Sequence, residues 1–285
     1  MKSRKDCLIS VVIPLYNSEK TIKDCLDSVL NQNYNNYEVI VVDNNSTDNS
    51  KKIIHKYKKI RYVFEAQRGR GAARNTGVKT SKGEIILMTD SDCIVPSNWI
   101  SEMIKPILYE EETIVMGHEY DLIGNTWTKF IQEANHILLK KNSNKNYINH
   151  LDTKNFAIKS EIAKKQSFDS KMKSLEDFEF YLRIKNSNKI RFLKDISVGH
   201  NHKSTFISLM KMQMDRGYWL IKIHNKHKNV TIEKGSMLES THFLNNLFFP
   251  IWFASIFLRN PLKKSIYLSI SELSWRIGML KSKIC

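Results

Sequence analysis

Polar clusters follow three apolar runs in the first hundred residues of the sequence. The clusters are Tyr16-Asn17, Asp43 and Asp90-Ser-Asp92. On an extended chain alternate side chains face the same way, so the carboxylates of Asp90 and Asp92 are predicted to converge on one point. Hard oxygen ligands of this kind suit Mg²⁺ or Mn²⁺. Because Asp is also common in ordinary turns, a site is indicated only by the alignment of all three clusters.

The elements that must position these clusters alternate between strand and helix. A buried strand is predicted over Leu8–Ile13, and Ser18 is expected to cap a helix whose apolar positions run from Ile22 to Leu30 at helical spacing. Further strands are predicted at 37–42, 61–64 and 84–88, and further helices at about 47–59 and from 68–71 onward. This alternation is typical of a mostly parallel sheet covered on both faces. Ligands bind outside the carboxyl ends of such strands, which places the three clusters on one edge.

The pattern changes in the second part of the chain. The predicted elements are a strand at 113–121, helices at 126–141 and 204–226, a short segment at 153–159, an acidic helix start at Glu176-Asp177 and a strand at 190–198 followed by Gly199-His-Asn-His202. The polar stretch 142–149 is predicted to be a loop and the seam between two halves.

Charge is distributed unevenly along the chain. The formal net charge is +16, from 45 Lys and Arg against 29 Asp and Glu. Residues 1–139 are net neutral, so the whole excess lies in the second half. A basic half indicates an anionic partner, such as a membrane surface, a phosphate group or a nucleic acid.

The cysteines indicate in which cellular compartment the protein folds. The four cysteines are scattered without a Cys-x-x-Cys pair, which indicates neither a zinc site nor disulfides and fits a reducing cytosol.

Two C-terminal segments, Phe243–Leu258 and Ile266–Leu280, are rich in apolar residues. A spanning helix needs about 20 apolar residues, and Asn245, Asn246 and Pro250 argue against one, so interfacial anchoring is favoured over burial in the protein core and over a span.

Five separated motifs occur in an order that resembles family 2 inverting glycosyltransferases of the GT-A fold. They are Val11-Val-Ile-Pro-Leu-Tyr-Asn17, Val41-Val-Asp-Asn-Asn-Ser-Thr-Asp48, Gly71-Ala-Ala-Arg-Asn-Thr-Gly77, Asp90-Ser-Asp92 and Glu176-Asp-Phe-Glu-Phe-Tyr-Leu-Arg183. The resemblance covers residues 8 to about 220. It implies an α/β fold with a Rossmann-like nucleotide-sugar-binding sheet, flanking helices and a helical, apolar C-terminal extension.

The resemblance also implies a role for particular residues. The nucleotide sugar is expected to contact Pro14, Tyr16, Glu19, Asp43, Arg74 and Asp90. Asp92, with Asp90 and His200, is expected to hold the Mn²⁺ or Mg²⁺ that bridges the diphosphate of the donor. Asp177 is expected to be the catalytic base, with Glu176 as its substitute. Without the resemblance, Glu176-Asp177 reads as charges favoured by a helix dipole, and His200 and His202 as solvated loop residues. Arg68 and Arg70 are a departure from the family pattern to which no role is assigned.

The function expected from these observations is metal-dependent, inverting transfer of a sugar. The donor is a nucleoside diphosphate sugar, with UDP as the default, and the acceptor is a hydroxyl of a lipid-linked, polyprenyl-linked or surface glycan. The expected parts are a nucleotide-sugar domain at 1–139, an acceptor side at 140–235 and a helical, membrane-associating segment at 236–285. Peripheral contact with an anionic membrane at its cytoplasmic face is expected, and no nucleic-acid partner.

Two alternatives are weighed against this function. A nucleotidyltransferase acting on a sugar phosphate needs a Gly-rich loop with a Lys after the first strand, and the chain has Pro14-Leu-Tyr-Asn17 there. A basic nucleic-acid-binding protein is suggested by the net charge, but no recognised module of that kind is present and acidic strand ends repel phosphates.

Overall fold

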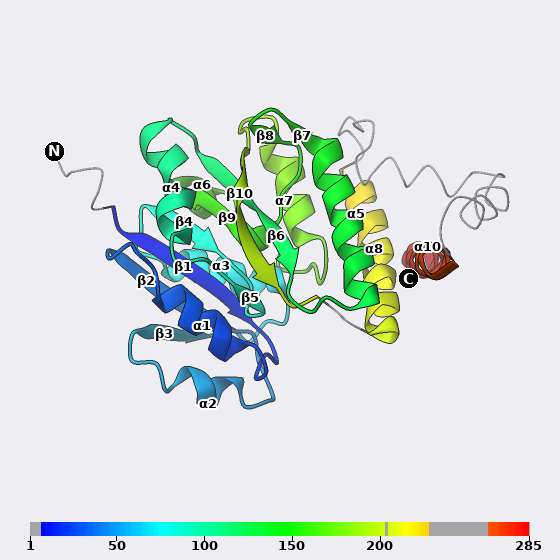
Figure 1. The fold of residues 1–285 in the computed structure, drawn as a ribbon, viewed down its shortest axis with the longest axis horizontal. Coiled ribbons are helices and arrows are strands. Elements are labelled where there is room, and N and C mark those ends of the chain that lie inside the picture. The colour runs from blue at the N-terminus through cyan, green and yellow to red at the C-terminus, as the bar shows by residue number, and fades with distance from the viewer. Residues whose placement is uncertain (1–6, 203–204, 228–261, 285) are drawn as a thin grey trace. The chain divides into compact units, whose positions relative to one another are not determined.

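A computed structural model describes residues 7–202, 205–227 and 262–284 of the chain (Figure 1). The chain divides into two compact units. Unit 1 comprises Met1–Leu122 and Ser143–Asn201, and unit 2 comprises Ile123–Asn142 and His202–Cys285. The sequence-based boundaries at 139 and 235 stay a prediction, and residues 236–261 lie outside the described part.

Unit 1 opens with the alternation that the sequence predicts. Its elements up to residue 121 are β1 (Ile9–Leu15), α1 (Ile22–Leu30), β2 (Tyr37–Asp43), α2 (Ser50–Ile54), β3 (Ile60–Phe64), α3 (Arg70–Thr80), β4 (Ile85–Met88), β5 (Cys93–Ile94), α4 (Trp99–Tyr109) and β6 (Ile114–Asp121). β1 pairs in parallel with β2 and β4, and β2 with β3, as expected. Alternate residues of β1 face opposite sides of the sheet: Ile9 and Val11 lie in the core beneath α1 and α4, whereas Val12 meets Gly77 of α3.

The rest of unit 1 extends the same sheet and makes it mixed. Its elements are β7 (Ser143–Asn144), β8 (Tyr147–Ile148), the short 3₁₀ helix η2 (Thr153–Asn155), β9 (Phe156–Lys159), α6 (Ser160–Lys165), α7 (Glu176–Ile184) and β10 (Arg191–His200). The described strands form one sheet of ten in the order β3-β2-β1-β4-β9-β6-β10-β8-β7, with β5 paired to β10. β9 runs antiparallel to both neighbours, β4 and β6. The predicted α/β architecture is therefore confirmed as a mixed sheet with flanking helices.

Three local predictions are corrected by the structure. α1 begins at Ile22 after Thr21, and Ser18 instead accepts the backbone N–H groups of both residues through its carbonyl. α2 is limited to Ser50–Ile54 because a turn ends it at His55. The polar stretch 142–149 is not a plain loop, since β7 and β8 pair within it as a hairpin and β8 joins β10.

Unit 2 is helical in its described residues. It contains α5 (Thr126–Asn142), α8 (Phe206–Lys226) and α10 (Leu262–Ile284). Ile131, Leu209 and Tyr267, one from each helix, form its apolar core. No helix of the described residues is both long and apolar enough to cross a membrane. The apolar run Phe243–Leu258 lies outside these residues.

Two glycines let α8 and α10 approach closely. A Cβ atom on Gly217 of α8 would collide with the backbone of Trp275, and one on Gly278 of α10 with the backbone of Met214. Backbone cannot move aside as a flexible side chain can, so the absence of a side chain at both positions is what permits this contact.

Gly278→Ala is expected to lower the midpoint of thermal unfolding. In an isolated helix this change is stabilising by up to about 1 kcal/mol, but overpacking against Met214 costs about 1–3 kcal/mol and reverses the sign. Circular dichroism melting measures the difference, with Lys281→Ala, at an exposed position of the same helix, as the control. A midpoint raised as in a free helix contradicts the close approach of α8 and α10.

Candidate active site

The carboxyl ends of β1, β2 and β4 meet at one edge of the sheet (Figure 1). Leu15, just after Pro14, pairs with Asp43, and Val12 pairs with Met88, two residues before Asp90. The Ser18 hydroxyl lies 2.7 Å from that of Ser91 and links the loop after β1 to the Asp90–Asp92 turn. The polar clusters therefore lie together, but Asp90 and Asp92 flank a turn after β4 and do not alternate along a strand.

The loops after β1 and β2 are held together by side chains. Asn17, with a left-handed φ of 47°, accepts a hydrogen bond from the Thr47 backbone at 2.8 Å. The Glu19 carboxylate accepts one from the Asn49 backbone at 3.0 Å, and its own N–H donates to Asp48 at 2.9 Å. Glu19, expected at the donor nucleotide, is thus engaged in binding the second loop.

Asp43 lies buried with both carboxylate oxygens oriented by the protein. Tyr62 donates its hydroxyl proton to Oδ2 at 2.8 Å, and the Ser46 backbone N–H donates to Oδ1 at 2.9 Å. Each carboxylate oxygen has a second lone pair, so Asp43 still has acceptor capacity for a ligand. Tyr62 was not identified from the sequence, although it lies on β3 opposite Val41, two residues before Asp43.

Tyr16, in the loop after β1, is an exposed aromatic residue. The guanidinium carbon of Arg68 lies 3.8 Å from the ring centroid, and Arg68 also donates to the Asn45 carbonyl at 3.0 Å. A cation at this distance is attracted by the ring electrons. The structure therefore gives Arg68, which had no assigned role, a defined contact with a residue expected to bind the nucleotide.

Arg74 is the centre of a buried charge cluster. It is 1% exposed, donates to Asp90 at 2.9 Å and forms a short ion pair with Glu176, which is 2% exposed. Burial alone would lower the pKa of Arg74, but the two carboxylates outweigh it and raise that pKa. Glu176 is therefore not a solvated charge in the first turn of a helix. It holds α7 to α3, across a hundred residues of sequence.

Asp177 differs from Glu176 in its surroundings. It is partly exposed, and its carboxylate accepts the Phe178 backbone N–H at 2.8 Å. Desolvation and the nearby charges of Glu176 and Asp152 raise the pKa of Asp177 to about 7. A carboxylate with this pKa can accept a proton near neutral pH, which the salt-bridged Glu176 cannot do as readily.

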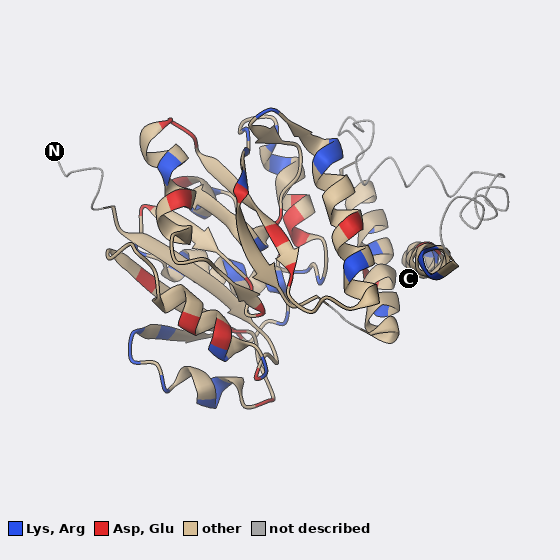
Figure 2. Cartoon of the chain, viewed as in Figure 1, with Lys and Arg blue, Asp and Glu red and all other residues tan. Residues whose placement is uncertain are grey.

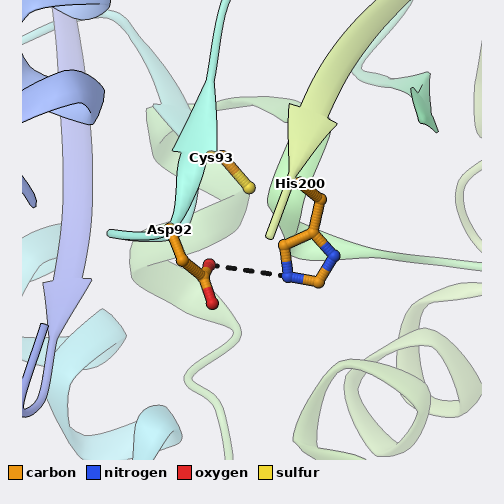
Figure 3. Close-up of side chains that lie close together, drawn as sticks. All are labelled: Asp92, Cys93 and His200. Carbon is orange, nitrogen blue, oxygen red and sulfur yellow. Dashed lines mark ion pairs between the residues drawn. The ribbon is translucent and has the colours of Figure 1, made fainter. Parts of the chain in front are cut away.

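Asp92, Cys93 and His200 bring potential ligand atoms within 4.8 Å of one another (Figure 3). The turn before β5 carries Asp92, and the end of β10 carries His200, which is paired in register with Cys93. The Nε2 atom of His200 lies 3.5 Å from the Asp92 carboxylate. Neighbouring ligands of an octahedral ion bound at about 2.1 Å lie about 3 Å apart, so this pair fits Mg²⁺ or Mn²⁺ after a small adjustment. Burial raises the pKa of the Cys93 thiol well above its usual value, which disfavours it as a ligand.

A second charge network adjoins His200, and its members were not identified from the sequence. His200 Nδ1 lies 3.4 Å from Glu119, and Glu119 lies 3.1 Å from the ammonium of Lys154, which also pairs with Asp152. Burial lowers the pKa of His200, but Asp92 and Glu119 outweigh it and raise that pKa to about 9. A metal ion at His200 must therefore displace a proton. No motif marks Glu119 or Lys154, because these residues come together only in the fold, from β6 and from η2, beside the end of β10.

The comparison with family models decides the assignment. Residues 10–169, more than half of the chain, match the model of glycosyl transferase family 2. The chain belongs to glycosyl transferase family 2. The resemblance drawn from the five motifs is thus confirmed, and the protein is a glycosyltransferase.

Relatives of this family 2 enzyme include characterised and uncharacterised proteins. The uncharacterized glycosyltransferase MJ1057 of Methanocaldococcus jannaschii is 29% identical over 262 residues, covering 85% of this chain and 83% of MJ1057. WfgD of Escherichia coli, a UDP-Glc:alpha-D-GlcNAc-diphosphoundecaprenol beta-1,3-glucosyltransferase, is 34% identical over 123 residues, covering 42% of this chain and 48% of WfgD. The match thus spans about half of WfgD.

A solved structure confirms the GT-A fold. The mannosyltransferase PcManGT from Pyrobaculum calidifontis, in complex with GDP-Man and Mn²⁺, aligns with a TM-score of 0.71 over 96% of this chain and 86% of its own. The two sequences are 17% identical, so the likeness concerns the fold.

Glu176→Gln is expected to destabilise the family 2 enzyme by up to about 3–5 kcal/mol, because it leaves the buried guanidinium of Arg74 short of a charge partner. Urea unfolding measures the change, with the exposed Glu161→Gln as control. Burial raises the pKa of Glu176, but Arg74 and Arg70 outweigh it and lower that pKa. Its stabilising effect is therefore present above the ordinary Glu pKa of about 4.3 and is lost on further acidification. A difference that persists unchanged at low pH contradicts this ion pair.

Proposed function

We propose that this family 2 glycosyltransferase moves a sugar, with inversion, from a nucleoside diphosphate sugar to an acceptor hydroxyl. The observation that carries the proposal is the pairing of Arg74 with both Asp90 and Glu176, because it ties the start of α7, where the partly exposed Asp177 lies, to the Asp90–Asp92 turn. This pairing supports a site that combines a carboxylate suited to proton transfer with groups suited to a divalent metal.

The donor is bound on the side of β1 and β2. Asp43 and Tyr16 hold the base and the ribose, with Pro14 and Glu19 shaping the loop and Arg74 and Asp90 next to the diphosphate sugar. UDP is the default nucleotide, and the name of WfgD, which includes UDP-Glc, supports this choice. Asp92, Asp90 and His200 would hold Mn²⁺ or Mg²⁺, which would neutralise charge on the leaving diphosphate.

Asp177 removes the proton from the acceptor hydroxyl as its oxygen attacks the anomeric carbon. The bond from the anomeric carbon to the acceptor oxygen forms on the face opposite the bond to the diphosphate oxygen, which breaks, so the configuration inverts. The nucleoside diphosphate leaves with the electron pair of that bond, and the proton stays on Asp177 until solvent removes it.

The acceptor is a lipid-linked or surface glycan. The basic character of residues 140–235 and the diphosphoundecaprenol in the name of WfgD support an acceptor that carries phosphate. The enzyme is then expected to work at the cytoplasmic face of a membrane, in peripheral contact with anionic lipid. Cosedimentation with anionic vesicles, but not with neutral ones, tests this location.

Incubation with a panel of nucleoside diphosphate sugars and a sugar-diphosphate acceptor tests the function. Release of the nucleoside diphosphate is expected with one donor, dependent on Mn²⁺ or Mg²⁺ and abolished by EDTA. Release that is unaffected by EDTA, or no release from any donor, contradicts the proposal.

A further inference from the structure

A cavity of about 250 Å³ lies in unit 1 at the hairpin β7–β8, away from the residues described above. Its lining residues are of three chemical types: the buried Ile148, Tyr181 and Ile190, the polar Asn149, and the basic Lys185 and Lys189. Asn149 and Lys189 are exposed, so a ligand from solvent can reach these groups. Of these residues only Tyr181 belongs to a motif, and the proposed catalytic steps use none of them.

The cavity is joined to the catalytic edge along one face of α7. Asp177, Tyr181 and Lys185 are spaced at i, i+4 and i+8, and Lys185 continues the helical conformation of α7 with a hydrogen bond to the Tyr181 carbonyl. Residues at this spacing lie one above another on a helix. At a rise of about 1.5 Å per residue, the spacing along α7 therefore places Lys185, at the cavity, about 12 Å along the helix axis from Asp177.

The charge of the cavity favours an anion. Lys189 lies 5.5 Å from the ring centroid of Tyr147, and the nearby carboxylate of Glu112 already accepts the Tyr147 hydroxyl at 2.8 Å. α7 carries its acidic residues in the first turn, so this negative charge lies at the Asp177 end of the helix and not at Lys185 (Figure 2). Two ammonium groups can pair with phosphate oxygens, while amides and a tyrosine edge suit sugar hydroxyls.

We propose that this cavity is an acceptor subsite, which holds a phosphate or diphosphate group of the acceptor while the reacting hydroxyl lies at Asp177. The subsite rests on the proposed function for its role, although anion binding there does not require catalysis. A glycosyl diphosphate has a phosphate group and a free hydroxyl at opposite ends of one short molecule, as this separation demands. Acceptors without phosphate lack the group that Lys185 and Lys189 bind.

Binding of inorganic pyrophosphate to the full chain tests the site without catalysis. Titration calorimetry in EDTA suppresses metal-dependent binding at the donor edge. The double variant Lys185→Gln, Lys189→Gln is expected to bind pyrophosphate at least tenfold more weakly than the wild type. Lys165→Gln, which changes an exposed lysine of α6, is expected to bind it as the wild type does. Equal binding by wild type and double variant, an equal loss in Lys165→Gln, or no binding by the wild type overturns the subsite.

Transfer assays then distinguish the two sources of phosphate. The acceptors are a sugar diphosphate bearing a short alkyl chain, an oligosaccharide with a phosphodiester link, and the alkyl glycoside without phosphate. The double variant is expected to raise the KM for one phosphate-bearing acceptor at least tenfold, which identifies the source, and to leave the KM values of the donor and the neutral acceptor unchanged. An equal rise for the neutral acceptor overturns the subsite. If no variant transfers to any acceptor, the proposed function fails, and the pyrophosphate titration still decides the anion site.

Discussion

Asp177→Asn is expected to reduce the rate of sugar transfer by about 10²–10⁴-fold while donor binding is retained. The asparagine amide preserves the size of the side chain but cannot take a proton from the acceptor hydroxyl. Arg74, Asp90 and Asp92, which are expected to contact the donor, are unchanged. Initial rates of transfer, together with calorimetric titration of the nucleoside diphosphate, separate the two effects.

The pH dependence gives this prediction a second measurement. Because burial and the charge of Glu176 raise the pKa of Asp177 to about 7, the base is protonated and inactive at acid pH. Transfer by the wild type is therefore expected to fall as the pH drops below about 7, and this limb is expected to disappear in the residual activity of Asp177→Asn.

Stability distinguishes a lost base from a damaged fold. The pKa of Asp177 is raised on folding from an unfolded value near 3.8, so its contribution to stability is largest below that value and is lost as the pH rises through about 7. Asparagine does not ionise, so the Asp177→Asn variant does not lose stability as the pH rises. We expect the variant to melt at an equal or higher temperature than the wild type at pH 8. Transfer preserved in this variant moves the base to Glu176 or elsewhere.

Asp92→Ala is expected to abolish metal-dependent binding of the donor. Changes of residues that only orient metal ligands typically cost 10–100-fold in affinity, so loss of a ligand is expected to cost more than about 100-fold. Titration with Mn²⁺, with and without the nucleoside diphosphate, measures the loss, and EDTA is expected to reproduce it in the wild type.

Cys93→Ala is the matched control for the metal site. Cys93 lies in the same cluster, but its buried thiol stays protonated and is not expected to ligate Mn²⁺. This variant is expected to bind Mn²⁺ as the wild type does. Loss of Mn²⁺ affinity in Cys93→Ala together with unchanged affinity in Asp92→Ala contradicts the proposed ligands.

Local patterns predicted the first half of the sheet well and the hairpin poorly. β1, β2 and β4 are short apolar runs between turn residues, so their composition alone predicts that they are buried. β7 and β8 are two residues each, which is too short to show an alternation. Tyr147 of β8 pairs with Arg191 of β10, far along the chain, so this strand depends on the fold and not on its own side chains.

The start of α1 is a second feature that local patterns did not predict correctly. Ser18 is a good capping residue by type, yet its hydroxyl contacts Ser91 and the helix begins four residues later. The helical spacing of Ile22 to Leu30 was sufficient to place the buried face, but a tertiary contact decided where the helix begins.

The sequence by itself determined the family, the order of the motifs and the residues that end the strands of the donor edge, because each of these depends on neighbours close in the chain. Only the tertiary structure decided that Glu176 pairs with Arg74, that Tyr62 orients Asp43 and that Lys154 and Glu119 adjoin His200. These contacts join segments far apart in the sequence through the order and register of the sheet, and no spacing within one segment encodes them. Because of burial and these contacts, two adjacent carboxylates differ in their chemistry. Glu176 is an ion-pair partner, whereas Asp177 titrates near neutral pH.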